Sequence, residues 1–132
     1  MGVTAFITSE AFDVGRYMGR FQDGEDASTG TIVMHHGKVK RPGKVVGNFS
    51  RVLLEPVLPD PEKRMQETGQ KFLDQHGLNQ VFIVHRVGEV HARDDVLFVA
   101  VSGVTRDIAF AGCADIVDAI KEEKILRLVE VP

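Results

Sequence analysis

Residues 94–113 read DDVLFVAVSGVTRDIAFAGC, and this stretch decides the fold because a strand and a helix follow each other directly. The apolar run 96–101 has almost no polar alternation, which is typical of a strand buried on both faces near the centre of a sheet. From Thr105 apolar positions recur at helical spacing, so we expect a helix that ends at about Lys121. Ser102 and Gly103 lie at the end of this strand, where the chain leaves it for the helix.

The segments on either side of this stretch extend the pattern of strands and helices. β-branched and apolar runs predict strands, and periodic runs flanked by capping residues predict helices. The expected strands are 4–10, 30–40, 45–56, 79–90, 94–104 and 124–131, and the expected helices are 12–22, 59–77 and 105–121. Asp13 is a plausible cap for the first helix, and Gly77 follows the second.

The order of these elements predicts the fold class. Residues 30–56 read as a β-hairpin whose turn at 41–44 is basic. A mixed sheet covered by helices, an α/β or α+β architecture, accounts for the whole series. No linker is long enough for a second domain, so we expect residues 1–132 to form one domain.

Composition limits the class of function. There are 16 Lys and Arg against 19 Asp and Glu, a formal net charge of −3, which argues against general affinity for nucleic acid. No apolar run reaches the length of a membrane span, and residues 1–10 do not resemble a secretory leader. The single cysteine, Cys113, lies on the apolar stripe of a helix, which favours a core role and a cytoplasmic location.

Positive charge is nevertheless concentrated locally. Lys38, Lys40, Arg41 and Lys44 fall within seven residues of an otherwise acidic chain. Such a surface suits a small anionic ligand or an acidic partner. The alternative is a solvated hairpin with lysines on an edge strand, where they oppose aggregation.

Arg106 stands in the first turn of a predicted helix, where the backbone dipole is already positive. An arginine gains nothing from the helix there, but it suits an anion in front of the helix start, bound also by backbone amides. Gly103 and Thr105 belong to the same candidate substrate site. Plain capping of a strand-to-helix turn is the alternative for these small polar residues.

Lys121 and Lys124 follow the other end of the helix. Lysines there complement the negative helix terminus. A lysine surrounded by other cations can also become a nucleophile because its pKa falls, and Lys38, Lys40 and Arg106 would supply those cations if the fold brings them together.

The histidines do not predict a metal site: His35 and His36 point to opposite faces of a strand, and no further ligand stands at suitable spacing.

Several motifs, taken in order, resemble the large, catalytic subunit of molybdopterin synthase, the MoaE-like family. They are FDVG (12–15), GTIVMHHGKVK (30–40), LEP (54–56), VHRVGEV (84–90), VLFVAVSGVTRDIAF (96–110) and DAIK (118–121). The similarity spans nearly the whole chain and is strongest over residues 81–121. It implies the family's hammerhead-like α+β fold.

The resemblance also implies an activity and its partners. The family transfers sulfur from the thiocarboxylated C-terminus of a small ubiquitin-like subunit to cyclic pyranopterin monophosphate, giving molybdopterin in molybdenum cofactor biosynthesis, without a cofactor of its own. It forms a central homodimer with one small subunit at each end, a heterotetramer, and its pocket borrows residues from the neighbouring protomer. Arg106 matches the substrate arginine and Lys121 the essential catalytic lysine. Lys38 and Lys40 occupy the basic positions of the family's G-x-V-R motif.

The chain departs from the family at three positions. Leu128 stands where a second catalytic lysine is expected, although Glu130 still fits the motif. Thr105 replaces a histidine, and Lys40 an arginine. Lys124 or Arg127 is a candidate to supply the missing charge. Two hypotheses therefore remain open: a working synthase, and a diverged member that binds a pterin phosphate or a ubiquitin-like partner without catalysis.

Overall fold

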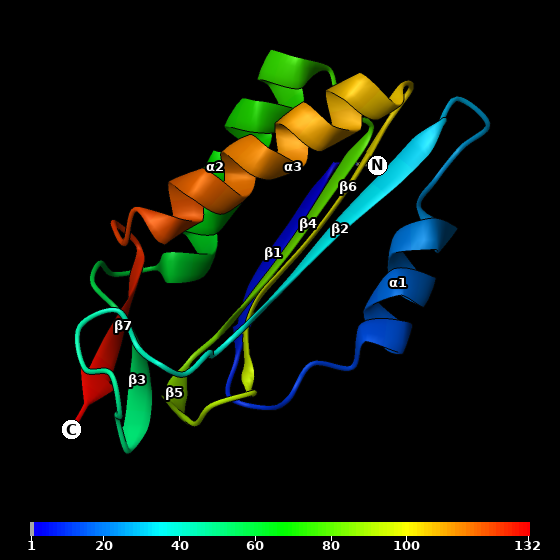
Figure 1. Ribbon diagram of the computed structural model, residues 1–132. Coiled ribbons are helices and arrows are strands. Elements are labelled where there is room, and N and C mark those ends of the chain that lie inside the picture. The colour runs from blue at the N-terminus through cyan, green and yellow to red at the C-terminus, as the bar shows by residue number, and fades with distance from the viewer. Residues whose placement is uncertain (1) are drawn as a thin grey trace.

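A computed structural model describes residues 2–132 (Figure 1). The strands are β1 (Val3–Thr8), β2 (Thr31–Lys38), β3 (Arg51–Pro56), β4 (Gln80–Arg86), β5 (Gly88–Val90), β6 (Asp95–Gly103) and β7 (Leu126–Val131). The helices are α1 (Val14–Asp23), α2 (Pro61–His76) and α3 (Arg106–Lys121). The mixed α+β architecture expected from the sequence is confirmed.

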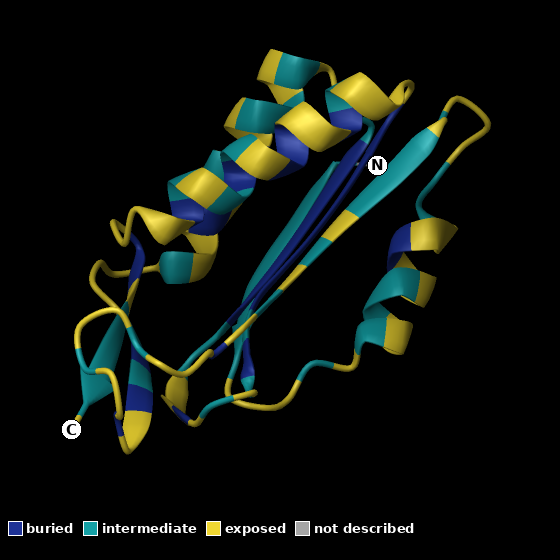
Figure 2. Ribbon diagram, viewed as in Figure 1, coloured by how far each residue is buried: buried dark blue, intermediate teal, exposed yellow. Residues whose placement is uncertain are grey.

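The larger sheet has four strands in the order β1-β4-β6-β2. β1 pairs with β4 in parallel, whereas β6 pairs with both β4 and β2 in antiparallel fashion, so the sheet is mixed. Helices α2 and α3 cover one face and α1 covers the other (Figure 1). β4 and β6 are buried along almost their whole length, as their continuous apolar runs predict (Figure 2).

A second sheet, β5-β3-β7, lies at the end of the molecule where α3 finishes (Figure 1). The prediction of a hairpin over residues 30–56 is therefore wrong, because β2 and β3 belong to different sheets. The register of β2 shifts between Gly37 and Lys38, and the chain then crosses to the smaller sheet. Val39 and Phe49, at the two ends of the crossing, are buried with Val52, Leu54 and Val90 in the core of that sheet. Burial of these apolar residues competes successfully with local strand pairing.

The helix ends follow local chemistry. Asp13 caps α1, with its side chain accepting a hydrogen bond from the backbone N–H of Arg16 at 3.1 Å. Gly77 adopts a left-handed conformation with φ of 66° at the end of α2, which a residue without Cβ adopts freely. In α3, Ala109, Cys113, Ile116 and Ile120 are buried against the sheet, as the periodicity predicts.

Candidate functional site

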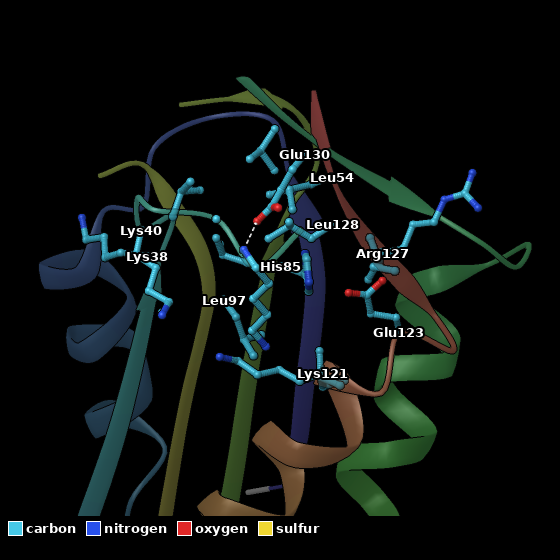
Figure 3. A pocket seen from close by; sticks show the side chains of 18 of the residues that line it. Lys38, Lys40, Leu54, His85, Leu97, Lys121, Glu123, Arg127, Leu128 and Glu130 are labelled. Atoms are coloured by element: carbon cyan, nitrogen blue, oxygen red, sulfur yellow. Dashed lines mark hydrogen bonds between the residues drawn. The ribbon is translucent and has the colours of Figure 1, made fainter. Parts of the chain in front are cut away.

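A cavity of about 210 Å³ lies where the end of α3, the end of β2 and the smaller sheet meet (Figure 3). One part of its wall is apolar and another is cationic. The apolar part includes Phe49, Val52, Leu54, Leu97, Ile120, Leu126 and Leu128. The charged side chains are Lys38, Lys40, Lys44, Lys121, Glu123, Arg127 and Glu130. The fold therefore brings Lys121 together with Lys38 and Lys40, which lie far from it in the sequence.

The cavity's cations differ in whether a carboxylate neutralises them. Nζ of Lys38 lies 2.8 Å from Asp95, and Nε of Arg127 lies 2.8 Å from Glu55. The Arg127 guanidinium points away from the cavity (Figure 3). Lys40, Lys44 and Lys121 form no ion pair with any carboxylate of residues 2–132. Their charges remain available to an anion entering the cavity.

Asp95, at the start of β6, fixes Lys38. One carboxylate oxygen bonds Lys38 and also lies 2.7 Å from Nε2 of His36, and the other accepts the backbone N–H of Phe12 at 2.7 Å. Burial of the carboxyl raises its pKa, but the hydrogen bonds from Lys38, Phe12 and His36 prevail and lower the pKa to about 2. Asp95 thus ties the segment before α1 to β2 and orients a cavity lysine.

Glu130, on β7, holds the basic loop that follows β2. Its carboxylate accepts backbone N–H groups from Lys44, Val45 and Val46 at 2.7–2.8 Å. The hydrogen bonds from Val46 and Val45 lower the pKa of Glu130 below its usual value. Three hydrogen bonds from consecutive amides to one charge fix this part of the cavity wall.

His85, on β4, lines the cavity and is almost completely buried. Its Nδ1 lies 2.7 Å from the carbonyl oxygen of Arg86. A carbonyl only accepts, so Nδ1 carries the proton and Nε2 carries a lone pair. Burial lowers the pKa of His85, which keeps the ring neutral near pH 7.

Arg106, Thr105 and Gly103 lie at the opposite end of α3 from this cavity. Arg106 and Lys121 begin and end the helix, which separates their backbones by about 22 Å at 1.5 Å per residue. Arg106 is exposed, whereas Gly103 is buried beneath the helix start, where an added Cβ would lie 3.2 Å from Ile108. Within one chain, the predicted substrate arginine and the predicted catalytic lysine do not meet.

Lys124 also lies outside the cavity. Its Nζ pairs with Glu122 at 2.9 Å, and the side chain borders a separate shallow hollow between α2 and the end of α3. Three residues past Lys121, beyond the end of the helix, the chain has turned toward β7. The structure therefore gives Lys124 a carboxylate partner and a different surface.

Known proteins share the sequence pattern and the fold of this chain. The family model described as MoaE protein matches residues 7–123. The chain belongs to the MoaE family. It is 32% identical to the molybdopterin synthase catalytic subunit of Yersinia pestis over 87% of this chain and 74% of that protein. It is also 32% identical to the catalytic subunit of Pyrococcus abyssi, over 73% of this chain and 64% of that protein. A role in molybdenum cofactor biosynthesis follows from this family membership.

Solved structures agree on the fold. Molybdopterin synthase from Staphylococcus aureus superposes with a TM-score of 0.81 at 23% identity, covering 96% of this chain and 90% of that one. A complex of subunits 1 and 2 of molybdopterin-converting factor from Helicobacter pylori gives a TM-score of 0.74 at 15% identity, covering 97% and 83%. Named relatives of the MoaE family are catalytic subunits, which supports an enzymatic role for this member.

Leu128 occupies the position at which the family resemblance predicts a second catalytic lysine. It lines the cavity on β7, pairs with Leu54 of β3 and packs against the core of the smaller sheet. A lysine here would place a charge on the cavity wall, but leucine extends the apolar wall instead. Among the described residues no cluster of three or more His, Cys, Asp or Glu could hold a metal ion, and none of the helices described is long and apolar enough to cross a membrane.

Proposed function

We propose that this chain is the catalytic subunit of a molybdopterin synthase, with the cavity at the end of α3 as its active site. The observation that carries the proposal is the convergence of Lys121 with Lys38, Lys40 and Lys44 in one cavity. Both reactants suggested by the family resemblance are anions: cyclic pyranopterin monophosphate, and the thiocarboxylate tail of a small ubiquitin-like subunit. The proposed location is the cytoplasm, a reducing compartment that is compatible with a thiocarboxylate.

The cationic wall binds and stabilises negative charge. Lys40, Lys44 and Lys121, which lack carboxylate partners among residues 2–132, attract the phosphate and the tail. The thiocarboxylate sulfur attacks a side-chain carbon of the pterin, and the oxygen substituent of that carbon leaves and takes up a proton. Water or the Lys121 amine then attacks the acyl carbon. The bond between this carbon and the transferred sulfur breaks, which leaves the sulfur on the pterin and the acyl group as a carboxylate or as an amide of Lys121. In the first case Lys121 assists proton transfer, and in the second it captures the spent acyl group.

A homodimer would complete the site with Arg106. β2 is an edge strand of the larger sheet, and it exposes Met34 at 50%. Val104 and Phe110, beside the start of α3, are exposed at 53% and 61%. Burial of these exposed apolar side chains between two copies would favour association. Because Arg106 begins α3, close in sequence to Val104 and Phe110, we propose that Arg106 acts in the cavity of the neighbouring protomer.

Leu128 favours a second candidate function, that of a diverged member which binds the pterin phosphate or the small subunit without transferring sulfur. Loss of one general acid or base costs about 10²- to 10⁴-fold in rate. The cations that bind anions are retained in either case, so binding alone does not discriminate between the two functions.

Lys121→Ala tests the proposed synthase. With a thiocarboxylated small subunit and cyclic pyranopterin monophosphate, we expect wild type to form the dithiolene product and Lys121→Ala to lose at least about 10²-fold in rate. Lys124→Ala is the matched control, because Lys124 lies outside the cavity, and it should retain wild-type turnover. Full activity in Lys121→Ala, with partner binding intact, would remove Lys121 from the reaction.

A further inference from the structure

Lys121 needs a hydrogen-bond acceptor to hold a fixed position. Its side chain is exposed, and it forms no ion pair with the carboxylates of residues 2–132. In contrast, Asp95 holds Lys38. An ammonium on a flexible four-carbon stem samples many positions unless an acceptor orients it. The reaction proposed above requires the Lys121 amine at one place.

His35 carries an unused polar atom close to this position. It lies on β2, two residues from Val33, and so on the face of the sheet that packs against α3. Its Nε2 is buried and has no hydrogen-bond partner within residues 2–132. Buried polar atoms are rarely left unpaired, because loss of hydration is then uncompensated. The ring is therefore a site that a mobile donor can satisfy.

Lys121 is near enough to act on the ring electrostatically. Burial lowers the pKa of His35, the positive charge of Lys121 on α3 lowers it further, and His36 on the same strand contributes less. Across the sheet, His35 is opposite Val99 of β6, which carries no charge. The imidazole is accordingly neutral near pH 7 and keeps a lone pair on one nitrogen.

Gly37 brings Nε2 close to the cavity wall. A Cβ at Gly37 would lie 2.9 Å from Nε2 of His35, and Gly37 itself lines the cavity. Nε2 therefore lies beside Gly37, in the space that a side chain at position 37 would need. Lys121 extends from the end of α3 toward the side of the cavity on which Lys38 lies, which is the β2 side (Figure 3).

We propose that His35 is a positioning residue for Lys121, and that Nε2 accepts a hydrogen bond from the Lys121 ammonium. The inference rests on the proposed synthase function and gives Lys121 a partner group in a cavity where Leu128 supplies none. A neutral ring serves this purpose, since an imidazolium would repel the ammonium. Acidification should therefore release Lys121.

Histidine-selective ¹⁵N NMR tests the contact without any turnover. We expect His35 to be protonated on Nδ1, with Nε2 as the acceptor, and its pKa to rise in Lys121→Met because the neighbouring cation is gone. His91, an exposed histidine on the turn before β6, is the control, and its resonances should be the same in both proteins. A His35 protonated on Nε2, or an unchanged His35 titration in Lys121→Met, would overturn the proposal.

Turnover tests the role of the contact. His35→Phe keeps a ring of similar size without an acceptor and should lower the rate about tenfold, the effect of one hydrogen bond to a charged group. His35→Gln supplies an amide oxygen and should restore most of the rate while losing the decline on the acid side that His35 protonation gives wild type. His91→Gln should follow the wild-type pH profile.

The possible results distinguish a failure of the His35–Lys121 contact from a failure of the synthase function. Thermal unfolding would first show that wild type, His35→Phe and His35→Gln are all folded. Equal rates and equal pH profiles for the three proteins would then overturn the positioning role. If wild type forms no product while NMR detects the coupling of His35 to Lys121, the synthase function fails and the contact stands. Retained activity in His35→Phe with no coupling by NMR would refute the contact and leave the synthase function intact.

Discussion

Replacement of Asp95 by asparagine should destabilise the protein by removing a charge that three hydrogen bonds stabilise. The amide would keep the shape of the side chain and one acceptor oxygen, but the attraction to Lys38 and His36 would be lost. Folding lowers the pKa of this carboxyl from the ordinary 3.8 to about 2. At about 1.4 kcal/mol for each pKa unit, the ionised carboxylate contributes about 2 kcal/mol to the free energy of unfolding. The side chain is only 8% exposed, so solvent screens little of this.

The contribution of Asp95 to the free energy of unfolding changes with pH in a defined direction. Because folding lowers the pKa of Asp95, the unfolded chain binds more protons between pH 4 and pH 2. The contribution of Asp95 is therefore complete above about pH 5 and is lost as the pH falls from about 4 through 2. The difference in unfolding free energy between wild type and Asp95→Asn should shrink over the same interval.

Urea unfolding followed by circular dichroism at pH 7, 5, 4 and 3 measures this difference. Asp94→Asn is the matched control, because Asp94 is adjacent in sequence but 43% exposed, and should change the free energy of unfolding by less than about 1 kcal/mol. If Asp95→Asn is as stable as wild type at pH 7, or if the difference is the same at pH 3 as at pH 7, the argument from Asp95 is wrong.

Three further perturbations have defined outcomes. Glu130→Ala removes the acceptor for three backbone amides, so amide hydrogen exchange at residues 44–46 should accelerate by about tenfold or more; unchanged protection would contradict the role of Glu130. His85→Phe should reduce the loss of thermal stability between pH 7 and pH 5, since burial lowers the pKa of His85 and wild type loses stability as the pH falls below the ordinary histidine value; an identical pH dependence would refute this. Arg106→Ala should weaken binding of cyclic pyranopterin monophosphate by about tenfold or more in calorimetry, and unchanged affinity would remove Arg106 from the site.

Local chemistry predicts much of the fold. The strand over the apolar run of β6, the cap at Asp13 and the end of α2 before Gly77 depend on neighbours in sequence, and each prediction is confirmed. The hairpin over residues 30–56 fails because its alternative is non-local. Val39 and Phe49 are buried together with β5, whose residues lie some forty positions later in the chain.

The sequence predicts the cavity lysines but not the residues that hold the cavity wall in place. Lys38, Lys40 and Lys121 are identified by charge clustering and by the family motifs, and the fold brings them to one cavity. Asp95 and Glu130 act over separations of about 57 to 86 residues, so no local pattern reveals what they bind. His85 stands within a family motif, but only the sheet places it in the cavity wall.

Single-turnover sulfur transfer by the wild-type protein is the direct test of the proposed synthase function. The protein would be mixed with a thiocarboxylated small subunit and cyclic pyranopterin monophosphate, and both the dithiolene product and the desulfurised partner would be quantified. We predict two sulfurs transferred for each pterin converted, although Leu128 stands in place of the second lysine. A stable complex with the small subunit but no dithiolene would contradict the claim and identify the chain as a binding protein.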